Sequence, residues 1–434
     1  MLKVVDVCTR IEGHGNVKII LQDDNISSVD FEVNELRGFE KILIGKRLIE
    51  IPRIVSRICG LCHASQSIVS CKAIEHIFNV EPDEQMVLLR KLLMTGELIK
   101  SHILHYFFQA LPDLLQIFGY FKEIPNPYEL IRYDPQLTSY IYELVKFGNE
   151  IDKIFGGRSV HLINTIPGGV IYTPLKKDFS TVKRYFQKVL VSTDYIIDRF
   201  INLFSNSSPP EQYSLPNTTF LGQHFHGNYG RYKGVLRLLT EQSKPIDFQF
   251  NNYARYFDKD PDLRGINFNL NKDTNVLVGP LARYNLIENY DVEEVDKYFT
   301  NFDNSWKRSS LFMNFIRLIE IFVEASQALN FLENPSLKGK RDLSILKKIE
   351  RKDGIGILEA PRGTLIHHYK IDEHKIVKEV KLFIATEINI PIINKMITDF
   401  AQKFYKTTGD INGVKSEVQK IIRSFDPCVS CASH

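Results

Sequence analysis

Two Cys-x-x-Cys pairs stand near opposite ends of the sequence and constrain its fold most. "RICGLC" carries Cys59 and Cys62, and "DPCVSC" carries Cys428 and Cys431. Such a pair can aim two sulfurs at one metal, and two pairs make a four-thiolate site that selects zinc, iron–sulfur clusters or soft transition metals. Because the entropy of loop closure grows only logarithmically with length, the long separation does not forbid one shared site. A shared site would require a fold that brings both ends of the chain together.

Two other interpretations of these cysteines stay open at this point. A zinc ribbon pairs two such turns, but usually with about 15–20 residues between them. The two pairs could also be separate redox pairs. The remaining cysteines, Cys8 and Cys71, are expected to be plain buried residues. A chain of this size without a signal peptide uses clustered cysteines for metal or redox chemistry more often than for a disulfide scaffold.

Charge and hydropathy exclude several classes of function. The net charge is +3, from 55 basic and 52 acidic residues that are well mixed, so no basic block points to nucleic acid. No stretch approaches about 20 uninterrupted apolar residues, so we expect no membrane span. The first residues, "MLKVVDVCTRIEGHG", contain no long apolar segment, and we therefore expect no signal peptide.

Periodicity predicts a mainly α fold with small β parts, built around a core of long helices. Apolar residues repeat at helical spacing in several segments, and alternating runs predict strands in two others. The helices are expected at 82–118, 136–155, 179–205, 305–332 and 390–406, and the strands within 1–35 and 354–385.

We expect one large unit over residues 1–434. Its parts are an N-terminal β-hairpin region, a helical core, a peripheral insertion rich in turn formers and aromatics, and a last part with helices, a small β region and a metal-binding segment. In order, these parts are 1–35, 36–205, 206–280 and 281–434.

Further motifs surround the cysteine pairs. They are "RIEGH" (10–14), "RGFE" (37–40), "SHILHYFFQALPDLL" (101–115), "GGRSVHLINTIPGG" (156–169), "EAPRG" (359–363) and the final "DPCxxCxxH". Together with "RICGxC" they resemble the large, catalytic subunit of [NiFe]-hydrogenases, in the family's order and close to its spacing. The amino-acid sequences of the two longest motifs are most similar to those of the cytoplasmic, cofactor-coupled branch (group 3, methyl-viologen- or deazaflavin-reducing type).

The resemblance implies a nickel–iron centre. Nickel would be held by the four paired cysteines, Cys59, Cys62, Cys428 and Cys431, and the second cysteine of each pair would also bridge to iron. The iron would carry carbon monoxide and cyanide ligands. The implied activity is reversible, heterolytic cleavage of H₂ into protons and electrons.

The motifs "EAPRG" and "DPC" supply further implied site residues. Arg362 would lie over the metals and donate to a cyanide, Pro361 and Thr386 would help line that pocket, and Asp426 would sit near Arg362. The alternative is ordinary structure, since "PRG" is often a turn and Asp before Pro is often a cap or turn residue.

Proton transfer needs a base near the metals, and the family uses the terminal thiolate that is Cys428 here. Glu12 would then pass the proton outward. Such a relay carboxylate needs hydrogen-bond reach and an intermediate pKa. The alternative for Glu12 is an ion pair with Arg10 or a neighbouring histidine.

A second metal is implied by Glu40 and His434. In the family, a hydrated, octahedral ion of the magnesium type ties this glutamate to the C-terminal histidine, and a backbone carbonyl, which we assign to Leu382, completes the protein ligands. Carboxylate and carbonyl oxygens with water suit Mg²⁺.

The sequence departs from the family in the helix after "CGLC". The family usually has histidine four residues after the second cysteine, where this chain has Gln66, and here His63 directly follows Cys62. Glutamine can donate a hydrogen bond to a bridging sulfur, but it cannot titrate. At the position where some members carry an acidic residue above the active site, this chain has Ser101.

Three functions follow as alternatives. The first is an H₂-oxidising or H₂-forming enzyme; the second is an H₂-sensing regulatory protein with low turnover, which Gln66 favours. The third is a relative of the respiratory complex I subunit, which the four thiolates oppose.

Two cysteines beyond the four cannot hold an iron–sulfur cluster, so we expect none in this chain. Electrons would pass to a small hydrogenase subunit that carries iron–sulfur clusters. Further electron-transfer subunits, linked to flavin, deazaflavin, nicotinamide or a disulfide reductase, are expected in a cytoplasmic complex.

Overall fold

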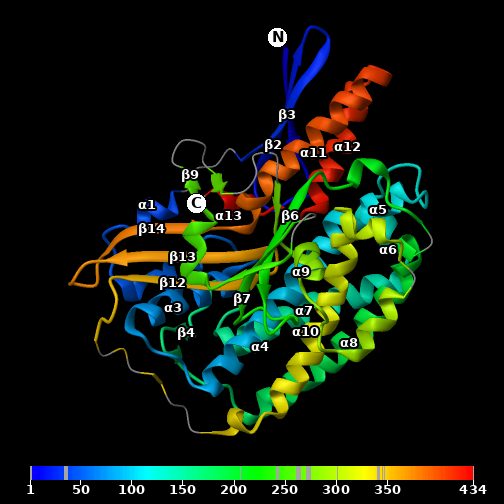
Figure 1. The fold of residues 1–434 in the computed structure, drawn as a ribbon. Coiled ribbons are helices and arrows are strands. Elements are labelled where there is room, and N and C mark those ends of the chain that lie inside the picture. The colour runs from blue at the N-terminus through cyan, green and yellow to red at the C-terminus, as the bar shows by residue number, and fades with distance from the viewer. Residues whose placement is uncertain are drawn as a thin grey trace.

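Four long helices pack together beside the largely β half of the fold in the computed structural model (Figure 1). They are α4 (Glu84–Leu104), α7 (Pro135–Gly156), α8 (Lys176–Ser205) and α10 (Phe312–Glu333). α4 packs against α7, and α10 packs against both α8 and α4. The mainly α fold with small sheets that the sequence predicts is confirmed.

The structure describes most of the chain. The described residues are 2–33, 38–205, 207–240, 244–260, 265–269, 275–300, 302–339, 343–344, 346 and 348–433. Within these ranges, none of the helices combines the length and the apolar character that crossing a membrane requires.

The ends of α7 show how the sequence sets helix boundaries. The Asp134 side chain accepts a hydrogen bond from the N–H of Leu137, Pro135 occupies the first turn, and Gly157 adopts a left-handed conformation just after the helix. These are the usual N-terminal cap, first-turn proline and C-terminal glycine.

α4 is followed by a π-helical turn, η2 (His105–Ala110), and then by α5 (Leu111–Ile117). A π-helical turn inserted in a helix is rare and frequently lies at a functional site. Here it carries His105, which contacts Asp426 near the C-terminus, as described below.

Helix α3 (His63–Phe78) lies on a three-stranded antiparallel sheet of β12 (Asp353–Ala360), β13 (Gly363–Ile371) and β14 (Val377–Phe383). Two glycines of β12 permit this close approach. A Cβ atom at Gly354 would lie 2.2 Å from the carbonyl oxygen of Ala73, and one at Gly356 would lie 2.1 Å from that of Val69. Any larger residue would push the helix, with the cysteine that precedes it, away from the sheet.

The N-terminal sheet protrudes from the body, as Figure 1 shows. It consists of β1 (Leu2–Cys8), β2 (Gly15–Gln22) and β3 (Asn25–Val33), in that order. β3 is fastened to α11 (Ala385–Thr408), because Asn394 and Thr398 accept hydrogen bonds from the N–H groups of Phe31 and Val29. The segment between β1 and β2 lies against the C-terminal part of the chain, where Glu12 forms a β-bridge with Cys428.

Residues 206–280 contain most of the remaining strands. A four-stranded sheet has the order β11–β6–β7–β8, and β9 pairs with β10. The bounds are β6 Thr218–His224, β7 Val235–Leu239, β8 Ile246–Phe248, β9 Phe257–Asp260, β10 Gly265–Phe268 and β11 Asn275–Leu277. Every residue of β6 is buried, so this strand belongs to the interior of the molecule.

Short elements complete the fold. A two-stranded ribbon pairs β4 (Thr165–Ile166) with β5 (Gly169–Val170). The remaining helices are α1 Phe39–Leu43, α2 Ile51–Val55, α6 Pro127–Tyr133, α9 Pro280–Leu286, α12 Ile411–Ser424 and α13 Val429–Ala432. The short turns are η1 Leu48–Glu50, η3 Glu211–Tyr213, η4 Phe250–Arg255, η5 Glu293–Phe299, η6 Asn304–Arg308 and η7 Pro335–Lys338.

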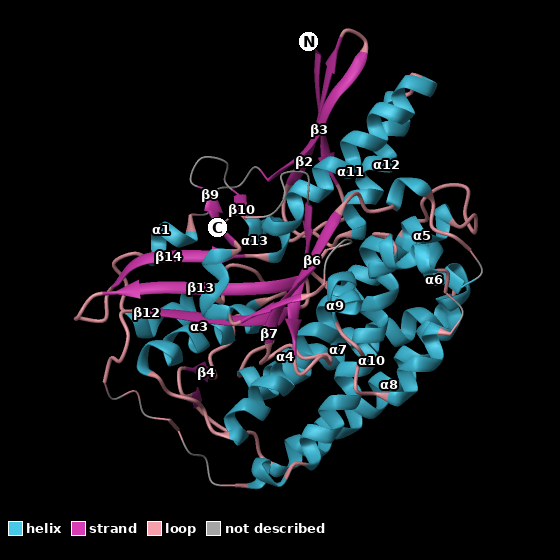
Figure 2. Cartoon of the chain, viewed as in Figure 1, coloured by secondary structure: helices cyan, strands magenta, loops and turns pink. Residues whose placement is uncertain are grey.

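The candidate site lies where these parts meet. Figure 2 places α13 beside the β12–β14 sheet and the start of α11. The segment after α2, the turn after β1, the corner between β12 and β13, and α13 all contribute residues.

Candidate metal centre

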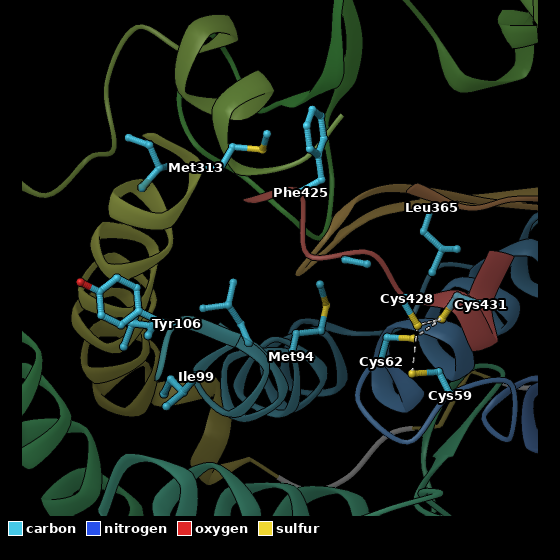
Figure 3. Packing of buried hydrophobic residues seen from close by; sticks show 14 of the residues in the cluster. Cys59, Cys62, Met94, Ile99, Tyr106, Met313, Leu365, Phe425, Cys428 and Cys431 are labelled. Atoms are coloured by element: carbon cyan, nitrogen blue, oxygen red, sulfur yellow. Dashed lines mark hydrogen bonds between the residues drawn. The ribbon is translucent and has the colours of Figure 1, made fainter. Parts of the chain in front are cut away.

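The structure brings the four paired cysteines into one cluster, although they come from opposite ends of the sequence. The Sγ atoms of Cys59, Cys62, Cys428 and Cys431 lie within 4.8 Å of one another, and all four residues are buried. Individual Sγ–Sγ distances are 3.0 Å for Cys62–Cys431, 3.4 Å for Cys59–Cys428 and 2.8 Å for Cys428–Cys431 (Figure 3). These exceed the length of a disulfide bond, roughly 2.05 Å, and all four are free cysteines.

The first pair is positioned by the start of α3. Cys62 is the residue immediately before this helix. The carboxylate of Glu97 on α4 accepts hydrogen bonds from the N–H groups of Ala64, at 2.6 Å, and Ser65, at 3.1 Å. A buried carboxylate therefore satisfies the free N–H groups of the helix and holds the Cys62 turn in place.

The second pair is positioned by the N-terminal motif. Glu12 and Cys428 form a parallel β-bridge, in which the N–H of Val429 donates to the carbonyl of Glu12 at 3.0 Å. The hydroxyl of Thr386, at the start of α11, accepts a hydrogen bond from the N–H of Cys428 at 2.9 Å. Both hydrogen bonds fix the loop that carries the sulfurs.

The donor set fits a soft metal. Hydrogen bonding from Cys428 lowers the pKa of the Cys59 thiol, whereas burial raises the pKa values of Cys428 and Cys431 well above the usual range. A cation that binds here displaces the protons of the remaining thiols, because metals bind the thiolate form. Four converging sulfurs are the ligand set expected for zinc, iron–sulfur or nickel chemistry.

Glu12 touches the cluster directly. The thiol of Cys428 donates to Oε2 of Glu12 at 3.0 Å, and the N–H of Ser430 donates to the same oxygen at 3.1 Å. Glu12 is half-buried. Its carboxylate thus links a buried sulfur to the edge of the protein. The alternative pairing of Glu12 with Arg10 is not found among the described contacts, where Arg10 pairs with Asp113 instead.

Arg362 lies at the corner between β12 and β13 and is held by Asp426. Its Nη2 donates to Oδ1 of Asp426 at 2.9 Å, and its Nε donates to the carbonyl of Asp426 at 2.9 Å. Nη1 lies 3.4 Å from the hydroxyl of Ser101, which therefore occupies the other side of the guanidinium. Asp426 adopts φ 54°, a conformation uncommon outside glycine, and this brings its carbonyl and its carboxylate to the same arginine.

Asp426 is surrounded by positive and polar groups. Nδ1 of His105, from the π-helical turn, lies 3.2 Å from its Oδ1, and Nε of Arg317 lies 3.9 Å from its Oδ2. Burial alone would raise the pKa of Asp426, but the contacts with Arg362 and His105 outweigh it and hold the pKa well below its usual range. Asp426 is therefore a fixed negative charge that orients Arg362.

Pro361 is held from behind by a buried arginine. Nη2 of Arg283, on α9, donates to the carbonyl of Pro361 at 3.0 Å, and its Nη1 donates to that of Ala360 at 3.2 Å. Arg283 in turn forms a forked pair with Glu320 on α10, with both N–O distances at 2.6 Å. The β12–β13 corner is thereby fixed to the helical core.

Glu40 lies beside Leu382, the residue to which the second-metal hypothesis assigns a carbonyl ligand. The contact between them is made by the backbone N–H of Leu382 and not by its carbonyl. The N–H of Leu382 donates to Oε1 of Glu40 at 2.7 Å. Nζ of Lys259 lies 3.7 Å from the same oxygen and 2.7 Å from both carboxylate oxygens of Glu387. Burial raises the pKa of Glu387 to about 7 despite this lysine. His434 lies outside the described residues.

Gln66 lies one helical turn after Cys62 and is buried. Its side-chain oxygen is 2.8 Å from Nε2 of His367 on β13. His63 does not join this contact: its Nε2 lies 3.2 Å from Nζ of Lys100, which pairs with Asp152.

Several supporting residues were not predicted from the sequence, among them Glu97, Asp113, His367, His105, Arg283 and Ser430. Asp113 receives Arg10 on one oxygen and Nε of Arg423 on the other, the latter at 2.6 Å. A buried acid in "LPDLL" and a histidine in "LIHHYK" are visible in the sequence, but their partners are far away in the chain and no local pattern names them.

Comparisons with known proteins agree with this geometry. A family model described as nickel-dependent hydrogenase matches residues 37–126 and 240–434, and one described as HoxL-like matches residues 4–36. The chain is 30% identical to an F420-non-reducing hydrogenase subunit of Methanothermobacter marburgensis, over 98% of this chain and 93% of that protein. It is 29% identical to the NAD-reducing hydrogenase HoxS subunit beta of Cupriavidus necator, over 99% and 94%.

Solved structures share the fold. An NAD⁺-reducing [NiFe]-hydrogenase in the H₂-reduced state superposes with a TM-score of 0.90 at 24% identity, over the whole of both chains. The Ni-Fe-Se hydrogenase from D. vulgaris Hildenborough gives a TM-score of 0.75 at 20% identity, also over the whole of both chains.

Proposed function

The chain belongs to the nickel-dependent hydrogenase family, and from this premise we propose an assignment of its metal centre and of the residues that serve it. As a hydrogenase large subunit, it is an oxidoreductase that acts on H₂. In the proposal, the four cysteines, Cys59, Cys62, Cys428 and Cys431, would hold the nickel, and Cys62 and Cys431 would also serve the iron. Carbon monoxide and cyanide would complete the iron ligands.

The observation that carries this proposal is the contact of Glu12 with one sulfur of the buried four-cysteine cluster. The Sγ atom of Cys428 is 3.0 Å from Oε2 of Glu12. A structural zinc site is closed and needs no such carboxylate, whereas heterolytic chemistry needs a base at the metal and an exit for the proton.

Each residue around the metals then has its own role in proton transfer. When bound, the nickel–iron group supplies the soft, redox-active metal at which H₂ is polarised and from which electrons leave. The thiolate of Cys428 accepts the proton, and Oε2 of Glu12 receives it next, since the two atoms are already within hydrogen-bond reach. The N–H of Ser430 stabilises the carboxylate form of Glu12 before each transfer.

Arg362 stabilises negative charge above the sulfurs. Its guanidinium is held by Asp426 on two sides, so its free N–H direction is set before a ligand binds. In the proposal that direction is toward a cyanide ligand, and Pro361 and Thr386 line the same pocket. A preorganised donor of this kind needs no rearrangement during the reaction.

A second, hydrated divalent ion of the magnesium type is part of the proposal. Its ligands would be Glu40, a carbonyl of the Leu382 segment and His434. The proximity of Glu40 to the backbone of Leu382 supports it. Such an ion would tie the segment that ends in α13 to α1 and β14.

An iron–sulfur partner subunit would take the electrons away. The surface near Cys59 supports this: Val160 and Ile163 are 40% and 38% exposed, and Val160 lies next to Gly60. Apolar side chains exposed beside a buried redox site are typical of a surface that a partner covers. Further electron-transfer subunits and a cytoplasmic location, which suits six free cysteines, belong to the same proposal.

An H₂ sensor is the second candidate, because Gln66 replaces the titratable histidine at this position. Turnover distinguishes the two functions. The purified native complex should reduce an artificial acceptor such as methyl viologen under H₂ at roughly 1–10³ turnovers per second, the usual range for enzymes, if it is an enzyme. A rate lower by several orders of magnitude, with the same metals, would favour the sensor.

The metal assignment is tested on the native complex from its own host. We expect one nickel and one iron per chain by elemental analysis, and infrared bands from iron-bound carbon monoxide and cyanide. Zinc as the only metal at the thiolates of active material would overturn the assignment.

A further inference from the structure

Four buried side chains on α3 and β13 form a chain of hydrogen-bond contacts. Nε2 of His367 is 2.8 Å from Oε1 of Gln66, and Nδ1 of His367 is 2.6 Å from the hydroxyl of Tyr369. That hydroxyl lies 3.1 Å from Oγ of Ser70. All four residues are at most 1% exposed, so water does not compete for these contacts.

The two elements place these residues together by their regular periods. Gln66 and Ser70 are one helical turn apart and share a face of α3, whereas His367 and Tyr369 are two residues apart and share a face of β13. Cys62 is four residues before Gln66 and lies on the same side of the helix. The chain of contacts therefore begins one turn from a cysteine of the cluster.

The donors and acceptors fit one proton arrangement. An amide oxygen only accepts, so the Nε2 atom of His367 must carry the proton that it shares with Gln66. In the neutral imidazole, Nδ1 is then an acceptor and takes the proton of the Tyr369 hydroxyl. The hydroxyl of Tyr369 also lies 3.1 Å from that of Ser70, and this contact anchors the far end of the chain of contacts on α3.

We propose that His367 is a positioning residue that fixes the side-chain amide of Gln66. With its oxygen held by His367, the amide presents its NH₂ group on the other side, toward the sulfur of Cys62. The reverse orientation would turn an oxygen lone pair toward a thiolate, which is unfavourable. This inference rests on the proposed function, since it assigns Gln66 as a donor to a sulfur that nickel and iron share.

The contact with His367 also explains how this chain accommodates glutamine at position 66. The side-chain amide of glutamine has a hydrogen-bond donor, the NH₂ group, and an acceptor, the oxygen. Only the NH₂ group suits an electron-rich sulfur. The imidazole that the family usually has at this position is replaced here by an amide that an imidazole on the neighbouring strand holds in orientation.

Infrared spectra of the native complex test the inference, because the stretching bands of the iron ligands respond to hydrogen bonds at a bridging sulfur. We expect His367→Leu to shift these bands or split them into two sets, as the amide populates both orientations. His367→Gln keeps a donor toward Gln66 and should restore a single set. Tyr369→Phe provides a milder second variant if His367→Leu does not fold, and it should broaden or split the bands.

His368, the residue after His367 on β13, offers a matched control. His368 faces the opposite side of β13, where its Nδ1 is 2.8 Å from the hydroxyl of Tyr253. His368→Leu removes a similar imidazole–tyrosine contact and should leave the bands unchanged. Gln66→Glu retains the acceptor and loses the donor, so it should shift the bands, and adding His367→Leu should give little further shift.

The outcomes separate this inference from the proposed function. Wild-type bands that persist unchanged in His367→Leu, with unaltered nickel content, would overturn the positioning role alone. A wild-type complex without carbon monoxide and cyanide bands would overturn the proposed metal centre, and the positioning role with it.

Discussion

Arg362 and Asp426 are joined by two hydrogen bonds of equal length, one to the carboxylate and one to the carbonyl, each 2.9 Å. A lysine cannot make both bonds and still direct a further donor over the sulfurs, because its ammonium is a single point of charge. We therefore expect Arg362→Lys to retain nickel and iron and to lower H₂ oxidation roughly 10²- to 10³-fold, the usual cost of losing a preorganised donor.

Methyl viologen reduction under H₂, with metal content measured on the same sample, checks this expectation. Arg237→Lys is the control, since Arg237 on β7 makes a forked pair with Asp247 away from the cysteine cluster. Turnover of Arg362→Lys close to that of the control would show that Arg362 does not act on the reaction.

Glu12→Gln replaces the proton-accepting carboxylate with an amide of nearly the same shape. The backbone bridge between Glu12 and Val429 does not depend on the side chain, so the cysteines should stay in place and the metals should be retained. We expect H₂/D⁺ exchange to fall by about 10²- to 10⁴-fold, as for loss of a general base. Glu32→Gln on β3 should have no effect, and near-normal exchange in Glu12→Gln would refute the relay.

Asp113→Asn should destabilise the protein, because it leaves Arg10 and Arg423 without the charge that they share. Breaking a buried ion pair from one side typically costs about 3–5 kcal/mol of the free energy of unfolding. The midpoint of guanidinium unfolding should fall accordingly, and the C-terminal segment should become more sensitive to protease. An unchanged midpoint would mean that water or another group replaces the carboxylate.

Glu320 gives stability a defined dependence on pH. Burial opposes its ionisation, but the charge and paired hydrogen bonds of Arg283 outweigh burial and lower the pKa of Glu320 to about 2, from 4.5. Since the folded-state pKa is the lower one, the stabilisation is complete above pH 4.5 and is lost as the pH falls toward 2.

Guanidinium unfolding at several pH values between 6 and 2, for the wild type and Glu320→Gln, measures this effect. The difference in the free energy of unfolding between the two proteins should be largest at the upper end and shrink below about pH 4.5. A difference that is constant over the whole range would exclude ionised Glu320 as its source.

Glu40→Gln tests the second metal. An amide is a weaker ligand for a hard cation than a carboxylate, so the bound divalent ion should be lost while nickel and iron remain. His434→Ala should have the same effect. Elemental analysis for magnesium beside nickel distinguishes the two sites, and full retention of the second ion in both variants would contradict the proposed ligands.

Periodicity in the sequence predicted the central helices well. The helix expected at 136–155 is α7, Pro135–Gly156, and that expected at 179–205 is α8, Lys176–Ser205. The prediction at 305–332 began too early, because the carbonyl of Arg308 and residue Ser309 pair with the chain near Ser214, and α10 starts only at Phe312. Tertiary pairing overrode helix propensity there.

Helix α12, Ile411–Ser424, was not predicted, although its buried residues Val414, Val418 and Ile421 follow a helical spacing. This omission is an error of interpretation, since the signal was present in the sequence. The long helix predicted at 82–118 contains a π-helical turn at His105–Ala110. No local pattern reveals that interruption, and the partners of His105 there, Asp426 and Asn314, lie far away in the chain.

The candidate site likewise has residues that the sequence predicts and others that it does not. The cysteine pairs and Arg362 lie in short motifs that can be recognised in the sequence, and the structure places them together. Their supports come from residues that are distant in the chain: Glu97 caps the helix after Cys62, and His367 holds Gln66. Such partners are selected by packing, so a single sequence does not pair them.

The contact between Glu12 and Cys428 spans 416 positions of the chain. At a synthesis rate of roughly 5–20 residues per second, a ribosome needs roughly 20–80 seconds to make Cys428 after Glu12 has been made. For most of that interval Cys59 and Cys62 are present without the sulfurs that complete their cluster. The four-sulfur cluster therefore cannot close before Cys428 and Cys431 have been made, however early the first cysteine pair has folded.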